Sequence, residues 1–91
     1  MITGGAVKSI QTGSISITTD ASGRGTNTQT VNAVNTAKAV VLLNGAYSAT
    51  AQMTISAKAV LTNATTVTAS CNTSYAGAGT ITVDYTVIEY Y

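Results

Sequence analysis

The chain contains no histidine, and it has only three acidic residues and one cysteine. Histidine is the commonest general acid or base and the commonest metal ligand, so its absence removes most catalytic and metal-binding arrangements. A glycosidase-like pair of Asp84 and Glu89 is conceivable, but their odd separation places the two carboxylates on opposite faces of a regular strand. We expect both to be solvent-facing charges. The sequence therefore predicts a protein that is not an enzyme and that uses no cofactor or metal.

A single cysteine excludes an internal disulfide, so no covalent link staples this small fold. Cys71 lies in phase with Val67 and Ala69, on the inward face of an expected strand, and no histidine is present to activate it. We expect a buried structural thiol rather than a reactive or cross-linking one. Proline is absent as well, so no strand loses an amide donor to a proline ring.

Charge is scarce: charged residues make up 8% of the chain, against about 25% in typical domains, and the net charge is +1. Nucleic-acid binders concentrate basic residues on one face, whereas the four basic residues here are scattered singly. No stretch approaches the ~20 apolar residues that span a membrane, and the first residues lack the features of a signal peptide. We therefore expect no nucleic-acid or membrane partner, synthesis in a cytoplasm, and little electrostatic resistance to self-association.

Apolar residues are present in ordinary amount, at 45%, and the polar remainder is mainly Thr, Ser, Asn and Gly. This balance favours a folded chain over a disordered one, and Thr suits a pleated, half-buried surface. The length predicts one domain over residues 1–91. We therefore expect a single β-rich domain.

Alternation of apolar and polar residues, separated by polar turns, predicts about six strands. The expected strands cover residues 13–18, 28–34, 38–43, 53–61, 66–71 and 80–91. The second of these has few large apolar residues, which predicts an edge strand. The fourth and fifth read as a hairpin around residues 62–65.

Three local features qualify this pattern. Ile10 has the opposite parity to Ile15, which predicts a β-bulge near Gly13. Residues 38–43 form a continuous apolar run, typical of a strand covered on both sides, although a helix over residues 34–43 competes with it. The Asn-Gly pair at 44–45 that ends the run predicts a hairpin turn.

Several strands without a convincing βαβ unit predict a small antiparallel β-sandwich, either jelly-roll or immunoglobulin-like, with a small barrel as the alternative. Its core should collect the inward-facing apolar side chains from both sheets. The expected core residues are Ile15, Ile17, Val40, Leu42, Ile55, Leu61, Val67, Ile81, Val83 and Val87.

Tyrosines near the end of the chain point to contact with other chains, because Tyr joins a large apolar area to a polar tip. Tyr90 and Tyr91 are candidate interface residues, with a cap on the sandwich as the alternative, while Tyr85 is expected in the core. Residues 1–7 form a candidate N-terminal arm, with a frayed tail as the alternative. This arm adds Ile2 and Val7 to the candidate interface.

Four stretches carry a resemblance to a known group. Residues 8–17, KSIQTGSISI, resemble the opening of small β-rich bacteriophage virion proteins, and residues 34–45, 61–69 and 83–90 are similar to the same group. The resemblance implies a non-enzymatic virion subunit: a capsid decoration, head-fibre, collar or tail component. It also implies homo-oligomeric assembly with copies of itself and other virion proteins, and a location in the virion. It supplies no catalytic residues.

Two other functions remain open on the sequence. A host-surface carbohydrate-binding or adhesion module would take glycan as its partner, but sugar sites usually present aromatic platforms, and this chain has no Trp. An ice-binding or filament protein would need Thr in an internal repeat of fixed period, and we find no such repeat.

Overall fold

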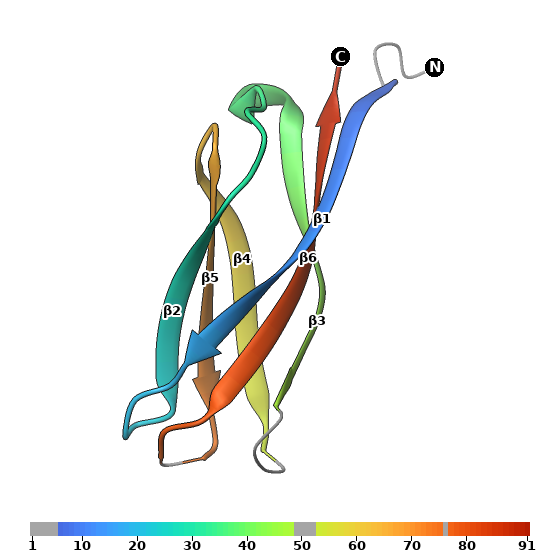
Figure 1. The fold of residues 1–91 in the computed structure, drawn as a ribbon. Coiled ribbons are helices and arrows are strands. Elements are labelled where there is room, and N and C mark those ends of the chain that lie inside the picture. Colours follow the sequence, from blue (N-terminus) through green and yellow to red (C-terminus); the bar gives the residue numbers. More distant parts are fainter. Residues whose placement is uncertain (1–5, 49–52, 76) are drawn as a thin grey trace.

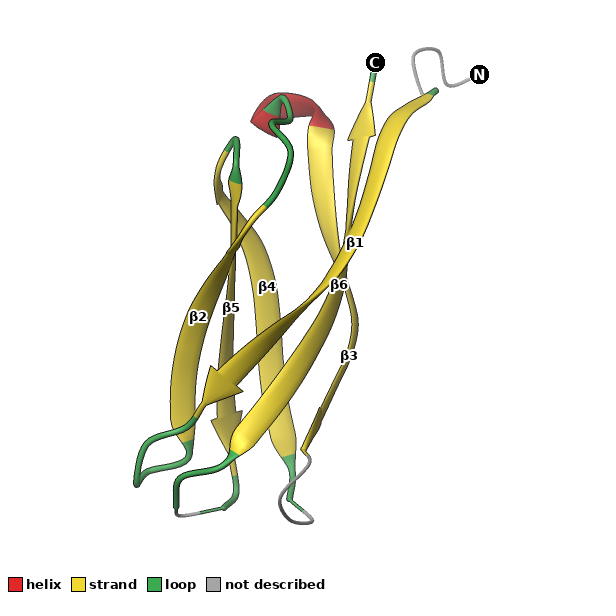
Figure 2. Ribbon diagram, in the orientation of Figure 1, coloured by secondary structure: helices red, strands yellow, loops and turns green. Residues whose placement is uncertain are grey.

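The computed structural model describes residues 6–48, 53–75 and 77–91, which form two layers of antiparallel strands (Figure 1). The strands are β1 (Val7–Thr18), β2 (Arg24–Thr30), β3 (Ala39–Ser48), β4 (Ile55–Asn63), β5 (Thr66–Thr73) and β6 (Thr80–Tyr90). A short 3-10 helix, η1 (Thr36–Lys38), precedes β3. Sheet A has the strand order β1-β6-β3, and sheet B has the order β2-β5-β4. The all-β sandwich predicted from the sequence is confirmed (Figure 2).

The strand order follows from a chain that folds back on itself. β1 pairs with β6, β2 pairs with β5, and β4 and β5 form the predicted hairpin. Rolling such a chain into two sheets is the jelly-roll pattern, here with fewer strands than the usual eight. Strands β2 to β6 also have the neighbour order of strands B to F in an immunoglobulin-type sandwich. Both sandwich types that the sequence left open therefore describe this order.

The sandwich is long and thin, with extents of 47 × 24 × 16 Å. Its radius of gyration is 14.7 Å, against about 12 Å for a compact domain of this length. Its accessible surface is 5352 Å², against about 4,900 Å² for a typical monomer of this mass. A thin rod has a narrow core, so a large share of its apolar side chains stays near the surface.

The core lies between the central strands, where inward-facing residues alternate with outward-facing ones. β6 shows this alternation along its whole length. The buried apolar residues are Ile15, Ile17, Val34, Val67, Ala69, Cys71, Ile81, Val83, Tyr85 and Val87. The predicted burial of Tyr85 and Cys71 is thus confirmed. The strand predicted over residues 28–34 is an edge strand as expected, but it runs from Arg24 to Thr30.

Two predicted core residues of β3 are on the outside. Val40 and Leu42 are 44% and 47% exposed, while Val41 packs against the core. The prediction failed because β3 is an edge strand of sheet A whose outer face is uncovered, although its apolar run is typical of a strand covered on both sides. On β4, an edge strand of sheet B, the predicted core residues Ile55 and Leu61 are only partly buried against the core.

The turn predicted at Asn44 and Gly45 is wrong. β3 continues through both residues to Ser48, and the ladder with β6 shifts register between Leu43 and Gly45. Neither residue has the positive φ that a tight Asn-Gly hairpin turn requires. Long-range pairing with β6 therefore overrides the local turn signal, and the pair forms a β-bulge.

Two further local predictions are corrected. The β1–β6 ladder is regular from Ser9 to Thr18, so the bulge predicted near Gly13 is absent, and Ile10 simply points to the outer face. The irregularity lies between Val7 and Ser9 instead. The competing helix over residues 34–43 is reduced to η1, where the Asn35 side chain accepts a hydrogen bond from the Ala37 amide at 3.0 Å.

Candidate interaction surfaces

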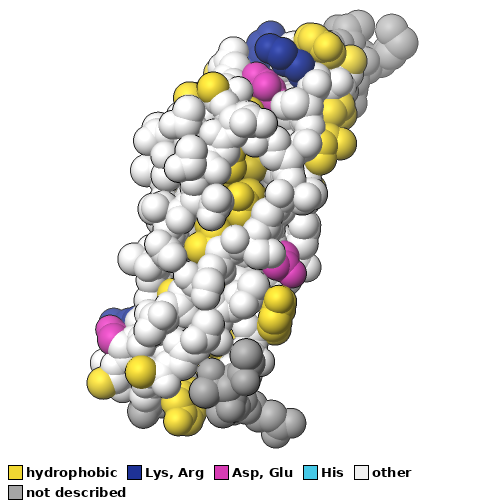
Figure 3. Space-filling model, in the orientation of Figure 1, with side chains coloured by type: hydrophobic (Ala, Val, Ile, Leu, Met, Phe, Trp, Pro, Cys, Tyr) yellow, Lys and Arg dark blue, Asp and Glu magenta, His cyan; other side chains and the backbone are white. Residues whose placement is uncertain are grey.

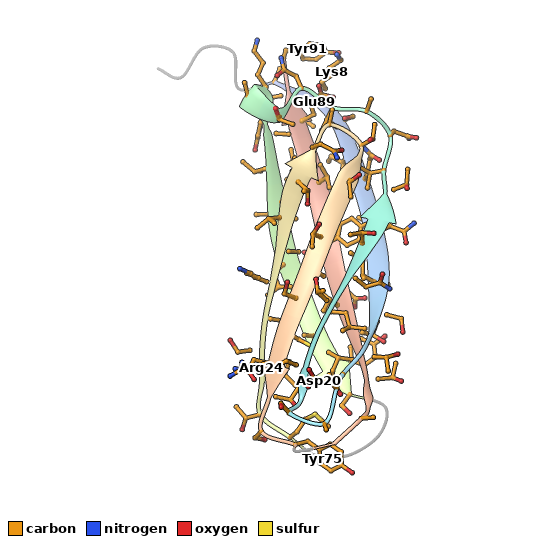
Figure 4. The ribbon with its side chains drawn as sticks, turned by 90° about the vertical axis from the view of Figure 1, so that its left-hand side faces the viewer. Lys8, Asp20, Arg24, Tyr75, Glu89 and Tyr91 are labelled. Carbon is orange, nitrogen blue, oxygen red and sulfur yellow. The ribbon has the colours of Figure 1, made fainter. Side chains whose placement is uncertain are left out.

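The described residues hold no group of three or more His, Cys, Asp or Glu side chains that could bind a metal ion. The acidic residues lie apart: Asp20 and Glu89 are at opposite ends of the molecule (Figure 4). Asp84 is on the outer face of β6, where Ser14 Oγ donates to its Oδ1 at 2.6 Å. Glu89 faces inward, so the predicted separation of Asp84 and Glu89 onto opposite faces is confirmed.

Glu89 is buried, which corrects the prediction of a solvent-facing charge. It is 5% exposed, and it continues the inward parity of Val87 at the end of the core. The Asn35 amide donates to its Oε2 at 2.8 Å, and Ser9 Oγ donates to its Oε1 at 3.2 Å. Lys8 Nζ lies 4.0 Å from Oε2. Glu89 therefore ties the start of β1 and the β2–β3 connection to the end of β6.

These contacts lower the pKa of Glu89. The hydrogen bond from the Asn35 amide contributes most, burial opposes it, and the Lys8 charge and the Ser9 hydroxyl add to the lowering. The carboxylate is thus held in its charged form by the groups around it. The parity of β6 was a sequence signal for this inward position, but the expectation that carboxylates face solvent outweighed it.

Cys71 is a free, buried thiol on β5, as predicted. Burial raises its pKa, and a hydrogen bond with the Gly25 backbone partly opposes that rise. A raised pKa leaves less of the nucleophilic thiolate at neutral pH. The chemical inertness of this thiol stays a prediction.

Three of the four predicted interface residues lie together at the end of the sandwich that carries both termini (Figure 1). Val7 pairs with Tyr90 across the β1–β6 ladder, and the Tyr91 amide donates to the Ala6 carbonyl at 3.1 Å. Val7 is 46% exposed and Tyr91 is 65% exposed. We call Val7, Tyr90 and Tyr91 the terminal cluster. Ile2 lies outside the described residues. Of the two arm residues that the structure describes, Ala6 precedes β1 and Val7 begins it.

Apolar side chains are visible at this end of the surface in Figure 3. One cross-strand row on the outer face of sheet A consists of Ile10, Ile88 and Val40, which are register partners. Ile10 is 62% exposed. This row was not predicted from the sequence, although Ile10 and Ile88 share the parity of outward-facing residues. The sequence feature that could have indicated this row is that both isoleucines lie on the otherwise polar face of their strands, β1 and β6.

A second exposed apolar surface runs along one side of the sandwich, where β3 and β4 are the edge strands. Val40, Leu42, Leu43 and Val60 are each 44–48% exposed, and we call them the edge strip. A shallow groove of about 400 Å³ lies beside them, lined by Thr36, Ala39, Val40, Val41, Ala59, Val60 and Leu61. In the described part of the chain, no backbone hydrogen bond joins residues 39–43 to residues 59–61. This side of the sandwich is therefore open.

The opposite side, between β1 and β2, is closed by side chains. Asn27 Nδ2 donates to the Ser16 carbonyl at 2.8 Å. The Gln11 side chain makes two bonds with the Asn32 backbone: Nε2 donates to the carbonyl at 3.0 Å, and Oε1 accepts from the amide at 2.8 Å. These amides occupy backbone groups that a neighbouring strand would otherwise pair with. The two long sides of the sandwich are thus chemically different.

Comparison with known proteins gives no match: neither a family model, nor a characterised sequence, nor a solved structure matches this chain. Among the described residues, no helix has the length and apolar character needed to cross a membrane. Function therefore has to be inferred from the fold and its two exposed apolar surfaces.

Proposed function

We propose that this chain is a non-enzymatic structural subunit that acts by homo-oligomeric assembly, and that the assembly is a bacteriophage virion. One observation carries the assembly: of the nine exposed large apolar side chains in the described part of the chain, six lie in the terminal cluster or the edge strip. The sequence resemblance supplies the kind of particle. Within it, the subunit is a capsid decoration, head-fibre, collar or tail component, made in the host cytoplasm and bound to copies of itself and to other virion proteins.

The exposed apolar surface, the small size and the low charge of the chain favour assembly over a free monomer. Contiguous exposed apolar surface on a soluble protein marks an interaction site or an aggregation liability. A domain of 91 residues without a disulfide has a thin margin of stability, and burial against neighbours widens it. A net charge of +1 opposes association only weakly.

The terminal cluster is tested by Tyr90→Ala combined with Tyr91→Ala. Truncating tyrosines at the centre of an interface removes large apolar contact area, so self-association should weaken by about tenfold or more. Tyr75→Ala is the matched control, because Tyr75 is 40% exposed at the opposite end of the molecule (Figure 4). Light scattering measures association, and electron microscopy of particles made with each variant measures incorporation.

The proposal predicts that the double variant enters particles poorly while its far-ultraviolet circular dichroism stays that of the wild type. Equal incorporation of the double variant and the Tyr75→Ala control would remove the terminal cluster from the interface. A wild-type chain that stays monomeric, never enters a particle and binds host-surface glycans would replace the assembly function with a carbohydrate-binding one.

A further inference from the structure

β3, which carries three of the four edge-strip residues, is unusual for an edge strand. Residues 39–43 of β3 are apolar at every position, so both faces of the strand carry apolar side chains. Such runs are typical of strands covered on both faces. Edge strands of monomers are usually protected by charge, proline or a covering loop. Here Val40 and Leu42 are about half exposed on the outer face, and the strand's free edge adjoins an open groove.

We propose that β3 pairs edge to edge with β3 of a second copy of this chain, in antiparallel orientation about a two-fold axis. Sheet A of one copy then continues into sheet A of the other. This inference rests on the proposed assembly function and names one of its contacts. The occupant has to be a strand, because residues 39–43 lie at the free edge of the sheet, where only another extended chain can continue the ladder.

The sequence of β3 is complementary to itself in one register. The bulge at residues 43–45 interrupts the β3–β6 ladder, which resumes from Gly45 to Ser48, so the regular segment that carries the apolar run is residues 39–43. Centring the two-fold axis on Val41 places Val40 opposite Leu42 of the second copy on the outer face. It also places the small Ala39 opposite the larger Leu43. Each pair is apolar, and directly opposed apolar side chains stabilise antiparallel pairing.

Charge favours this antiparallel arrangement. Lys38, immediately before β3, is the charged residue nearest to the pairing segment along the strand. In the register centred on Val41, the two copies of Lys38 are separated by about 20 Å along the strands, because each residue advances about 3.3 Å. That distance exceeds the screening length of about 8–10 Å in physiological salt, so the two charges repel weakly. A parallel pair would set them side by side.

The proposed pairing is a local contact on the long side of the sandwich. Five paired residues, at about 3.3 Å each, span about 16 Å of the 47 Å length of the molecule. Val60 on β4 extends the apolar surface on the same side into sheet B. On the β1–β2 side, the side chains of Asn27 and Gln11 hydrogen-bond to backbone carbonyls. The β3–β4 side is therefore the one suited to a second copy.

Val40→Lys tests the pairing, and Ile10→Lys is its matched control. Both side chains are exposed on the outer face of sheet A in the same cross-strand row, but Val40 is on the open edge and Ile10 is on the opposite edge. Sedimentation velocity of the full chain over a range of concentrations measures association, and circular dichroism shows whether each variant is folded. We expect Val40→Lys to weaken dimerisation at least about tenfold, because it opposes a charge to an apolar partner, and Ile10→Lys to leave it unchanged.

Cysteine cross-linking gives a second readout in a Cys71→Ser background. Val40→Cys with Leu42→Cys should form a covalent dimer on mild oxidation, because the two positions oppose each other across the axis, whereas Ile10→Cys should not. Equal association of wild type and Val40→Lys, or equal weakening by both lysine variants, would overturn β3 pairing while leaving assembly in place. A wild-type chain that is monomeric at every concentration and absent from particles would overturn the proposed function itself.

Discussion

Val83 lies at the centre of the core, with no exposed surface, between Ile15 of β1 and Ala46 of β3 in the ladders of sheet A. Val83→Asp would bury an unpaired carboxylate in this apolar site. We predict that it lowers the free energy of unfolding by about 3–5 kcal/mol. That loss is a large part of the roughly 5–14 kcal/mol available to a domain of this length. Urea unfolding followed by circular dichroism measures it.

Thr82→Asp is the control for this prediction. Thr82 is the preceding residue of β6 and faces outward, so a new carboxylate there remains hydrated. We expect the control to change the free energy of unfolding by no more than about 0.5 kcal/mol. Equal unfolding midpoints for the two variants would contradict the inward position of Val83.

Glu89 predicts how stability depends on pH. Its pKa in the folded chain is lowered, chiefly by the Asn35 amide, so near its ordinary pKa of about 4.3 the unfolded chain binds more protons than the folded one. The stabilisation is complete above that pH and is lost as the pH falls through the lower folded pKa. Urea unfolding at a series of pH values should show stability falling in this acidic range, and Glu89→Gln should reduce the fall.

Asp20 should account for part of the remaining pH dependence. Its pKa is lowered by hydrogen bonds from the Arg24 and Ser22 amides. Its contribution to stability therefore falls as the pH falls, like that of Glu89. Combining Asp20→Asn with Glu89→Gln should flatten the acidic range further than either change alone. An unaltered pH profile for Glu89→Gln would show that the contacts of Glu89 do not favour its charged form in the folded chain.

At the scale of elements, the β1–β6 ladder depends on a close fit between Gly13 and its register partner Tyr85. A Cβ atom on Gly13 would lie 2.5 Å from the Tyr85 hydroxyl oxygen and 2.7 Å from Cζ. Tyr85 is 3% exposed and has little room to move. Gly13→Ala should therefore cost about 1–3 kcal/mol of stability through overpacking, measured by urea unfolding.

Gly45→Ala on β3 is the matched control for Gly13→Ala. An added Cβ at Gly45 meets no atom within 4 Å, and its φ is not positive. We expect this substitution to be neutral or slightly stabilising, because alanine reduces the freedom of the unfolded chain. A cost at Gly45 equal to that at Gly13 would mean that strand glycines matter here for backbone reasons and not for the fit to Tyr85.

The central strands were predictable from the sequence, and the edge strands were predictable only in part. In β6, the alternation of residues such as Ile81 and Thr82 follows directly from the pleat, because both neighbouring strands are present. The exposure of Val40 depends instead on which strand forms the edge of the sheet, and the local sequence does not encode the strand order. The bulge at Gly45 was missed for the same reason, since pairing with β6 decides its backbone conformation.

The candidate surfaces show the same division. Tyr91 was expected at an interface from its residue type, and the structure places it 65% exposed beside Val7. The edge strip was not predicted, because it arises from strand order: β3 and β4 become neighbouring edges only when the two sheets stack. The burial of Glu89 likewise requires Asn35 and Ser9 to come from distant segments of the chain.

At the scale of the whole molecule, the sandwich is a rod 47 Å long with two candidate contact surfaces. The terminal cluster lies at one end, near both termini, and the edge strip lies along one side. Contacts at an end and along a side extend an assembly in two directions, which is what a lattice, ring or fibre of identical subunits needs. A role of this kind requires no reactive group.

Self-association of the wild-type chain is the most direct test of assembly. Sedimentation velocity from low micromolar to millimolar concentration should give a mean mass that rises above that of the monomer. Because the proposed contact surfaces are apolar and the net charge is small, added salt should not reverse the rise. A monomer mass at every concentration and salt level, with no incorporation into particles, would contradict the assembly function.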